Sequence, residues 1–322
     1  MAINNKPSIY VTRLLAEPAM QRLHAYFDVE CNPDDRILDQ SEIIEQVQGR
    51  DALLCLLTDT IDAAVMDAEP RLRVISNHAV GYNNIDVAAA NERKLPVCIT
   101  PGVLTETSAD ITWGLILAVA RRMVESDKFA RAGKWNGWGP LQFLGTDVHG
   151  KTLGIVGMGR IGAAVARRAK GFNMHVIYTA RTSKPEIESE VGAVKVELDQ
   201  LLGAADFVSL HVPLSSETTH LIGAKELCQM RPGAYLINTA RGPIIDEAAL
   251  VHALTEGHIA GAGLDVYEEE PTIHPELLNL NNTVLLPHIA SASLETRTKM
   301  AMLAVENAIM IFEGERPHAI VN

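Results

Sequence analysis

Short apolar runs alternate with amphipathic segments through the first hundred residues of the chain. Apolar runs that are mostly rich in β-branched residues predict strands at 9–15, 52–57, 72–79 and 96–100. Between them, apolar residues at helical spacing predict helices at 17–27, 41–48 and 86–94. Alternation of this kind predicts a parallel sheet that is covered by helices on both faces.

A long helical pattern then runs from Thr105 to about Ala132, and the alternation restarts after it. Six further apolar runs predict strands at 152–158, 175–180, 206–212, 234–240, 261–266 and 283–287. Six strands are the number that a dinucleotide-binding fold requires. The last helical pattern, 294–314, has no strand after it, so we expect it to pack back on the first unit.

The predicted fold class is therefore α/β, with two Rossmann-like or flavodoxin-like doubly wound parallel sheets and a cleft between the domains. We expect residues 1–100 and 291–322 to form a discontinuous substrate-binding domain. Residues 101–290 are expected to form the dinucleotide-binding domain.

Composition narrows the class of protein. The chain has 322 residues, 47% of them hydrophobic, which is enough for two cores. Its net charge of −12 disfavours nucleic acid or an anionic membrane as the main partner. Four scattered cysteines, without the spacing of a metal or redox motif, predict buried free thiols in a reducing compartment, and no metal site is expected. The first residues lack the pattern of a signal peptide, and the apolar helix near 114–120 is too short to span a membrane, so a cytoplasmic protein is expected.

A glycine-rich turn follows the first strand of the second unit. Gly157, Gly159 and Gly162 form a GxGxxG pattern between a predicted strand and a predicted helix. The first glycine permits a tight turn, the second admits a pyrophosphate, and the third allows close packing of helix and strand. The N–H groups of Arg160 and Ile161 at the helix start suit the pyrophosphate.

About twenty residues later, where this fold commonly places a carboxylate that binds a ribose, the chain reads Ala-Arg-Thr-Ser-Lys at 180–184. Arg181, Thr182 and Ser183, with Lys184 beside them, offer donors suited to the 2′-phosphate of NADPH. The alternative is that Arg181 is a solvated surface residue and that NADH binds without the usual carboxylate.

Three strand ends in the second unit carry polar residues. Arg241 follows one predicted strand, Asp265 ends the next with Glu270 in the loop beyond, and His288 follows the last. Because ligands bind at the carboxyl ends of parallel strands, these side chains can converge. Taken singly, each also has an ordinary interpretation: a surface charge for Arg241, a core-edge histidine for His288 and an acidic loop for Glu270.

Seven motifs in order resemble the D-2-hydroxyacid dehydrogenase family, most closely its glyoxylate/hydroxypyruvate reductases. They are GYNNIDVAAA, LTETSAD, GKTLGIVGMGRIG, LHVPLSSETTHLI, MRPGAYLINTARGPIIDEAAL, AGAGLDVYEEEP and LLPHIASAS, from about Val80 to near the C-terminus. Asn83 departs from the family, which often has Asp there. The segment YTARTSKP resembles that of the NADPH-using members.

The resemblance implies roles for individual residues. Arg241 is expected to anchor the substrate, His288 to act as acid and base, Glu270 to be its partner, and Asp265 to lie on the nicotinamide side. Implied cofactor contacts are Thr105, Gly157, Gly159, Arg160, Ile161, Gly162, Arg181, Thr182, Ser183, Val212, Pro213, Thr218, Thr239 and Asp265. Implied substrate contacts are Leu56, Val80, Gly81, Arg241, His288 and Ser291, with the backbone of Val80 and Gly81 holding the substrate carboxylate.

The chemistry explains these residue types. Hydride transfer to a 2-oxo acid leaves an alkoxide, which needs a proton, and histidine exchanges protons near neutrality. A carboxylate can fix its tautomer, and a guanidinium can bind a carboxylate while polarising a carbonyl. Together with this chemistry, the resemblance implies NADPH-preferring reduction of glyoxylate and hydroxypyruvate to D-2-hydroxy acids. Alternatives are a bulkier 2-oxo acid, another small acid such as phosphite, or a nucleotide-sensing corepressor.

The resemblance also implies a homodimer. The segment 134–151 looks like the family's dimer arm, with Trp138 reaching the partner's active site. The alternative is that Trp135 and Trp138 only cap the long helix.

Overall fold

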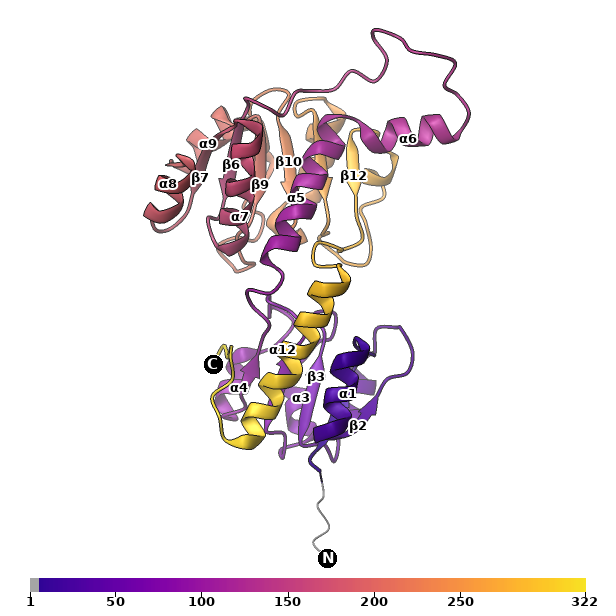
Figure 1. The fold of residues 1–322 in the computed structure, drawn as a ribbon, viewed down its shortest axis with the longest axis vertical. Helices are drawn as coiled ribbons and strands as arrows, with labels where there is room; N and C mark the ends of the chain where they lie inside the picture. The colour runs from indigo at the N-terminus through magenta and orange to yellow at the C-terminus, as the bar shows by residue number, and fades with distance from the viewer. Residues whose placement is uncertain (1–5) are drawn as a thin grey trace, which may run out of the picture. The chain divides into compact units, whose positions relative to one another are not determined.

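The computed structural model describes residues 6–322, which divide into two compact units. Unit 1 comprises residues up to Leu104 together with Ala292–Asn322, and unit 2 comprises Thr105–Ser291. Each unit is built on its own parallel sheet (Figure 1).

Unit 1 has a five-stranded sheet in the order β2-β1-β3-β4-β5, in which every pairing is parallel. This is the strand order of flavodoxin-like folds. Its elements are β1 (Ser8–Val11), α1 (Glu17–Tyr26), β2 (Asp28–Cys31), α2 (Gln40–Val47), β3 (Ala52–Cys55), α3 (Ala63–Ala68), β4 (Val74–Asn77), α4 (Val87–Glu92), β5 (Val97–Cys98) and α12 (Leu294–Glu313).

Helices cover both faces of the unit 1 sheet. One core contains apolar residues of α1 and α12, including Leu23, Ala304 and Ala308. The other contains residues of α2, α3 and α4, including Ile43 and Val65. The C-terminal helix α12 thus belongs to unit 1, where the hydroxyl of Ser76 in β4 donates to the carbonyl oxygen of Ala304 at 2.7 Å.

Unit 2 has a seven-stranded parallel sheet in the order β12-β11-β10-β9-β6-β7-β8. Counted from β6, this is the 3-2-1-4-5-6 order of dinucleotide-binding folds with a seventh strand added. Its elements are α5 (Thr105–Ala120), α6 (Met123–Arg131), β6 (Thr152–Val156), α7 (Arg160–Ala169), η1 (Lys170–Phe172), β7 (His175–Thr179), α8 (Pro185–Val191), β8 (Val194–Lys195), α9 (Leu198–Ala204), β9 (Phe207–Leu210), α10 (Ala224–Gln229), β10 (Tyr235–Asn238), η2 (Gly242–Ile244), α11 (Glu247–Thr255), β11 (Gly261–Leu264), η3 (Leu277–Asn279) and β12 (Thr283–Leu285).

The fold class predicted from the sequence is confirmed, and each of the ten predicted apolar runs contains a strand. Two further strands, β2 and β8, were not predicted. The residues of β2 alternate between exposed and half-buried, and both residues of β8 are exposed, so neither forms an apolar run.

The single long helix predicted from Thr105 to about Ala132 is wrong, because α5 ends at Ala120 and α6 begins at Met123. Between them Arg122 adopts a left-handed conformation, with a φ of 53°. Its guanidinium donates to both carboxylate oxygens of Glu125, at 2.9 and 2.8 Å, which stabilises the break. Neither glycine nor proline marks this position.

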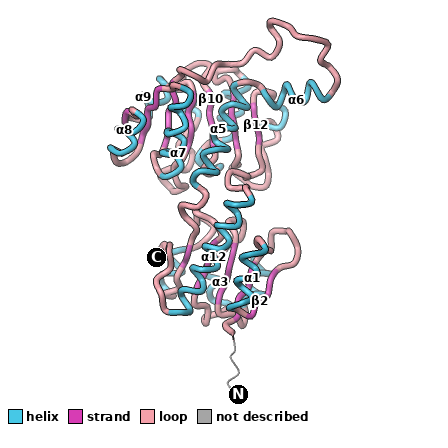
Figure 2. The backbone as a smooth tube through the Cα atoms, in the orientation of Figure 1, coloured by secondary structure: helices cyan, strands magenta, loops and turns pink. Residues whose placement is uncertain are grey.

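A long loop follows α6 and contains no helix or strand until β6 begins (Figure 2). It carries large apolar side chains in solvent: Trp135, Trp138 and Leu141 are 63, 83 and 79% exposed. These tryptophans therefore do not cap the helix by burial, because little of their surface is covered.

The thiol prediction is partly wrong. Cys55 and Cys98 are buried, Cys31 is half-buried, and Cys228 is exposed on α10. In the part of the chain that the structure describes, no helix is both long and apolar enough to cross a membrane.

Candidate active site

The polar residues singled out in unit 2 lie at one edge of its sheet. Because all seven strands are parallel, the loops that follow β6, β7, β9, β10, β11 and β12 leave the same edge. The chain reverses its direction of winding between β6 and β9, and this switch point is where open α/β sheets bind ligands.

The glycine turn after β6 has the geometry of a phosphate loop. Gly157 has a φ of 101°, and a Cβ there would lie 2.7 Å from the backbone carbonyl group of His211. A Cβ on Gly162 would lie 2.3 Å from the carbonyl oxygen of Gly157, so α7 can approach the turn only with glycine at that position. By contrast, a Cβ on Gly159 would meet nothing within 4 Å.

This open space at Gly159 suits the pyrophosphate of a dinucleotide. Gly159 precedes α7, whose first residues are Arg160 and Ile161. The first N–H groups of a helix have no partner within it, and they attract anions at its positive end. The turn therefore presents donors to a ligand, while a side chain at residue 159 would occupy the ligand's space.

The loop after β7 presents three exposed residues, Arg181, Thr182 and Ser183. Its base is held by Tyr178, whose hydroxyl donates to Glu188 Oε1 at 2.5 Å and accepts the N–H of Lys184 at 2.8 Å. The described segment 180–184 contains no carboxylate. A 2′-phosphate would therefore meet a cation and two hydroxyls here, and the Glu188 carboxyl is engaged by Tyr178.

Other predicted cofactor contacts lie in or near this edge, and two of them have hydroxyls that already have partners. Thr218 Oγ1 donates to the carbonyl oxygen of Pro213 at 2.7 Å, which closes the loop that follows β9 and contains Val212. Thr239, directly after β10, is 8% exposed and its hydroxyl lies 2.9 Å from that of Thr112 in α5. Thr105 is half-buried at the start of α5.

The structure brings Glu270 and His288 together although they are eighteen positions apart in the sequence. Glu270 Oε2 lies 2.8 Å from His288 Nδ1, and the two side chains are 30 and 24% exposed. Burial raises the pKa of Glu270, but the hydrogen bond with His288 and the charge of Arg241 outweigh burial, so the pKa lies below its ordinary value. Glu270 is therefore an anion at neutral pH, and it holds the Nδ1 side of the imidazole.

His288 adopts a left-handed conformation, with a φ of 55°, that is uncommon for a histidine. The carboxylate of Asp265 holds the turn that follows. It accepts the N–H of Ile289 and the N–H of Ala290, both at 2.7 Å. Two charge-assisted hydrogen bonds from a buried group offset the cost of this backbone conformation.

Asp265 has no exposed surface of its own in this structure. Its contact with the nicotinamide ring, which the resemblance implies, stays a prediction. Burial raises the pKa of its carboxyl, although the N–H groups of Ile289 and Ala290 act in the opposite direction.

Arg241 leads from β10 into a tightly packed turn. A Cβ on Gly242 would lie 1.7 Å from the carbonyl oxygen of Tyr267, so this turn packs directly on the loop that carries Glu270. Asn238 Nδ2 donates to the carbonyl oxygen of Arg241 at 2.9 Å, and Arg241 Nη1 donates to that of Ala240 at 2.7 Å. Burial lowers the pKa of Arg241, and the charge of Glu270 acts in the opposite direction.

Tyr267 was not predicted as a site residue, yet it positions Glu270. Its N–H donates to Glu270 Oε1 at 3.1 Å, and its hydroxyl donates to the carbonyl oxygen of Leu286 at 2.9 Å. It therefore joins the loop of Glu270 to the segment that leads to His288. A tyrosine between a valine and three glutamates carries no sequence signal for this role.

The predicted substrate contacts are divided between the units. Leu56 follows β3, and Val80 and Gly81 follow β4, so these three half-buried residues lie at the carboxyl edge of the unit 1 sheet. Ser291 is half-buried and is the last residue of unit 2.

A cavity of about 340 Å³ lies elsewhere in unit 2, at the amino ends of its strands. Its lining includes Tyr235 and Thr283, the first residues of β10 and β12, and Leu144 of the long loop. The catalytic candidates lie at the opposite ends of the same strands, so this cavity is separate from them. Among residues 6–322, no group of three or more potential ligands is placed to hold a metal ion.

Comparisons with known proteins agree with this arrangement. Residues 113–290 match the family model described as "D-isomer specific 2-hydroxyacid dehydrogenase, NAD binding domain". A protein named glyoxylate reductase from Thermococcus litoralis is 50% identical over 321 residues, covering 98% of this chain and 97% of that protein.

Two solved structures are similar over their whole length. A glyoxylate reductase from Paecilomyes thermophila superposes with a TM-score of 0.88 at 35% identity, covering 98% of each chain. An NADPH-dependent glyoxylate/hydroxypyruvate reductase from Sinorhizobium meliloti, in complex with NADP and malonate, superposes with a TM-score of 0.88 at 34% identity, covering 98% of this chain and 97% of that one. By sequence and by fold, the chain belongs to the D-isomer specific 2-hydroxyacid dehydrogenase family of NAD(P)-dependent oxidoreductases.

Proposed function

We propose that this protein reduces small 2-oxo acids, glyoxylate and hydroxypyruvate above all, to D-2-hydroxy acids, with NADPH as its preferred cofactor. The observation that carries the proposal is the 2.8 Å contact between Glu270 and His288, beside Arg241, at the ligand-binding edge of a dinucleotide fold. The names of the similar proteins support the substrate class.

In this proposal His288 supplies the proton. Its Nδ1 faces Glu270, which leaves Nε2 to give a proton to the oxygen of the 2-oxo group. The carboxylate of Glu270 fixes the tautomer and stabilises the imidazolium that gives the proton. Bound NADPH supplies the hydride. In the reverse direction the neutral imidazole takes the proton back.

Arg241 anchors the substrate. A guanidinium offers two parallel donors to a carboxylate, and the same cation stabilises negative charge that develops on the neighbouring carbonyl oxygen. The partial burial of Arg241 strengthens both effects, because fewer water molecules compete for its donors. We assign Leu56, Val80, Gly81 and Ser291 to further contacts with the substrate.

The preference for NADPH rests on charge. Arg181 stands beside two exposed hydroxyls in a loop without a carboxylate, so a 2′-phosphate gains charge-assisted hydrogen bonds there. NADH lacks this phosphate and gains none of them. A similar structure contains NADP, which supports the same choice.

We also propose that the protein acts as a homodimer. The loop 133–147 exposes Trp135, Trp138, Leu141 and Leu144, the last at 61%. Several large apolar side chains exposed in one loop are typical of a surface that a partner covers. We assign Trp138 to contact with the second copy near its active site.

Initial rates of NADPH oxidation test the proposed activity. We expect turnover with glyoxylate and hydroxypyruvate, and kcat/KM at least about tenfold lower for branched and aromatic 2-oxo acids, since a site matched to two- and three-carbon acids excludes added bulk. Higher kcat/KM for the bulky acids would make the protein a dehydrogenase for larger substrates. A protein that binds NADPH but turns over none of the acids would instead be a nucleotide sensor, and the proposal would fail.

A further inference from the structure

Two loops at the carboxyl edge of the unit 1 sheet are joined by polar side chains. The first loop, residues 56–60, follows β3 and begins with Leu56. The second loop, residues 78–84, follows β4 and contains Val80 and Gly81. The joining side chains are those of Thr12, Asp59, Asn77 and Asn84, and we call them the loop clamp. Thr12, Asp59 and Asn77 are 1, 2 and 0% exposed.

Asp59 fixes the first loop from within. Its Oδ2 accepts the N–H of Leu56 at 2.7 Å and the hydroxyl of Thr12 at 2.6 Å. The N–H of Asp59 donates in turn to the carbonyl oxygen of Leu56 at 3.1 Å, which closes a tight turn. Both backbone groups of Leu56 are therefore engaged by Asp59.

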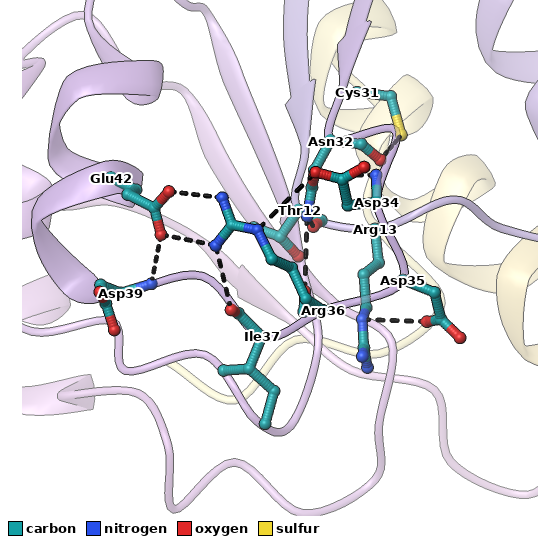
Figure 3. Close-up of polar contacts among 10 residues, drawn as sticks. All are labelled: Thr12, Arg13, Cys31, Asn32, Asp34, Asp35, Arg36, Ile37, Asp39 and Glu42. Atoms are coloured by element: carbon teal, nitrogen blue, oxygen red, sulfur yellow. Dashed lines mark hydrogen bonds and ion pairs between the residues drawn. The ribbon is translucent and has the colours of Figure 1, made fainter.

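Thr12 is itself held at the end of β1. Its N–H donates to the carbonyl oxygen of Leu54 at 3.1 Å. Its carbonyl oxygen accepts a hydrogen bond from Asn32 Nδ2 at 3.1 Å. Figure 3 shows these two residues together with the neighbouring pair of Arg36 and Glu42. The hydroxyl of Thr12 thus connects the first loop to the end of β1.

Asn84 joins the two loops. Its Nδ2 donates to the carbonyl oxygens of Leu56 and Asp59, each at 3.0 Å. Its Oδ1 accepts Asn77 Nδ2 at 3.2 Å, and Asn77 Nδ2 also donates to the carbonyl oxygen of Gly81 at 3.1 Å. Two amide side chains therefore connect the backbone of Leu56 with that of Gly81.

The chemistry of this position requires an amide. Asn84 donates two hydrogen bonds and accepts one, and an aspartate has the same shape but no donor. An aspartate at 84 would place a carboxylate oxygen against two carbonyl oxygens. A buried polar group without a partner lowers the free energy of unfolding by more than a hydrogen bond raises it when that group is paired.

We propose that Asn84, with Asn77, Asp59 and Thr12, positions the two loops of unit 1 for the substrate. The inference rests on the proposed function, since it takes Leu56, Val80 and Gly81 as substrate contacts. The loop clamp sets the spacing between the side chain of Leu56 and the N–H groups at Val80 and Gly81. None of its four side chains takes part in proton or hydride transfer, so these are positioning residues.

The decisive variant is Asn84→Asp, with Asn91→Asp as its matched control. Asn91 is exposed in α4 of the same unit and outside the loop clamp. Because displacement of substrate contacts by about 1 Å costs on the order of 10²-fold, we expect kcat/KM for glyoxylate to fall about 10- to 100-fold in Asn84→Asp, mainly through KM. The Kd of NADPH should stay within about twofold of wild type, because the phosphate loop lies in unit 2. An unchanged KM for glyoxylate would overturn the proposal.

A milder pair of variants separates positioning from packing. Thr12→Val keeps the shape of the side chain but removes the hydroxyl, whereas Thr12→Ser keeps the hydroxyl and removes a methyl group. One hydrogen bond corresponds to a change of about two- to tenfold, so KM for glyoxylate should rise by at least that factor in Thr12→Val and be restored in Thr12→Ser. If Thr12→Ser is impaired as much as Thr12→Val, packing explains the effect and the positioning role is wrong.

Amide hydrogen exchange tests the clamp without any assay of activity. In Asn84→Asp we expect both loops to exchange at least about tenfold faster, although the substitution lies in the second loop only. Faster exchange in 78–84 with wild-type exchange in 56–60 would refute the connection between the loops. If the wild type reduces no 2-oxo acid, the proposed function and the assignment to substrate fail together, while exchange still reports on the clamp.

Discussion

The contact between Glu270 and His288 makes a quantitative prediction about pH. In Glu270→Gln the side chain keeps its size, but the carboxylate that lies 2.8 Å from His288 Nδ1 becomes a neutral amide. The interaction with His288 lowers the pKa of Glu270, and a neutral amide at this position cannot make the same interaction with a charged ring. Reduction requires the protonated ring. Its rate, which falls as pH rises, should therefore begin to fall at lower pH.

The size of this shift follows from the geometry. A hydrogen bond between charged groups contributes about 1.5–3 kcal/mol. The two side chains are 24 and 30% exposed, so solvent screens the pair and the lower end of that range applies. Since about 1.4 kcal/mol corresponds to one pH unit, we expect the falling limb of reduction to move by about one unit toward acid. The rising limb of hydroxy acid oxidation, which needs the neutral ring, should move in the same direction.

The assay is kcat/KM against pH, measured in both directions. The matched control is Glu269→Gln, the same change at an exposed neighbouring residue, which should leave both limbs in place. His288→Ala should lose on the order of 10²–10⁴-fold in rate at every pH. The Glu270→Gln variant must first be shown to fold and to bind NADPH. If both limbs of its pH profile then stay where they are in the wild type, Glu270 does not set the pH dependence of kcat/KM.

Three further predictions concern the cofactor and the substrate. Arg181→Asp replaces attraction of the 2′-phosphate by repulsion, so the ratio of kcat/KM with NADPH to that with NADH should fall about tenfold or more, and equal effects on both cofactors would contradict the assignment. Arg241→Lys keeps the charge but loses the paired donors, so kcat/KM for glyoxylate should fall strongly while the Kd of NADPH, measured by fluorescence titration, changes little. Gly159→Ala puts a methyl group into open space, so this variant should unfold at the wild-type temperature but bind NADPH about tenfold more weakly. The control Gly171→Ala should also unfold at the wild-type temperature and should bind NADPH as the wild type does.

Much of the fold could be predicted because most strands are buried on both faces and form continuous apolar runs. The exceptions have clear causes. The edge strand β2 alternates between half-buried and exposed residues, and β8 is only two exposed residues long. The break between α5 and α6 could not be predicted, since Arg122 takes a left-handed conformation between residues that all favour a helix.

The sequence could single out Arg241, Glu270 and His288, which the structure brings together, but it could not predict their geometry. Strand ends drew attention to Arg241, Asp265 and His288, because polar residues there follow apolar runs. The pairing of Glu270 with His288 depends on how two separate loops fold back, and no spacing in the sequence encodes it. The place of Asp265, whose carboxylate holds the turn after His288, and the joining role of Asn84 are likewise visible only in hydrogen bonds.

The proposed function requires that Arg241 and His288 hold a small 2-oxo acid in one orientation toward NADPH. Reduction of hydroxypyruvate with NADPH, followed by separation of the two enantiomers of the product, tests this requirement. We expect D-glycerate alone, with one NADPH oxidised for each molecule formed. A racemic product, the L-enantiomer, or no oxidation of NADPH by a protein that binds it would refute the proposed function.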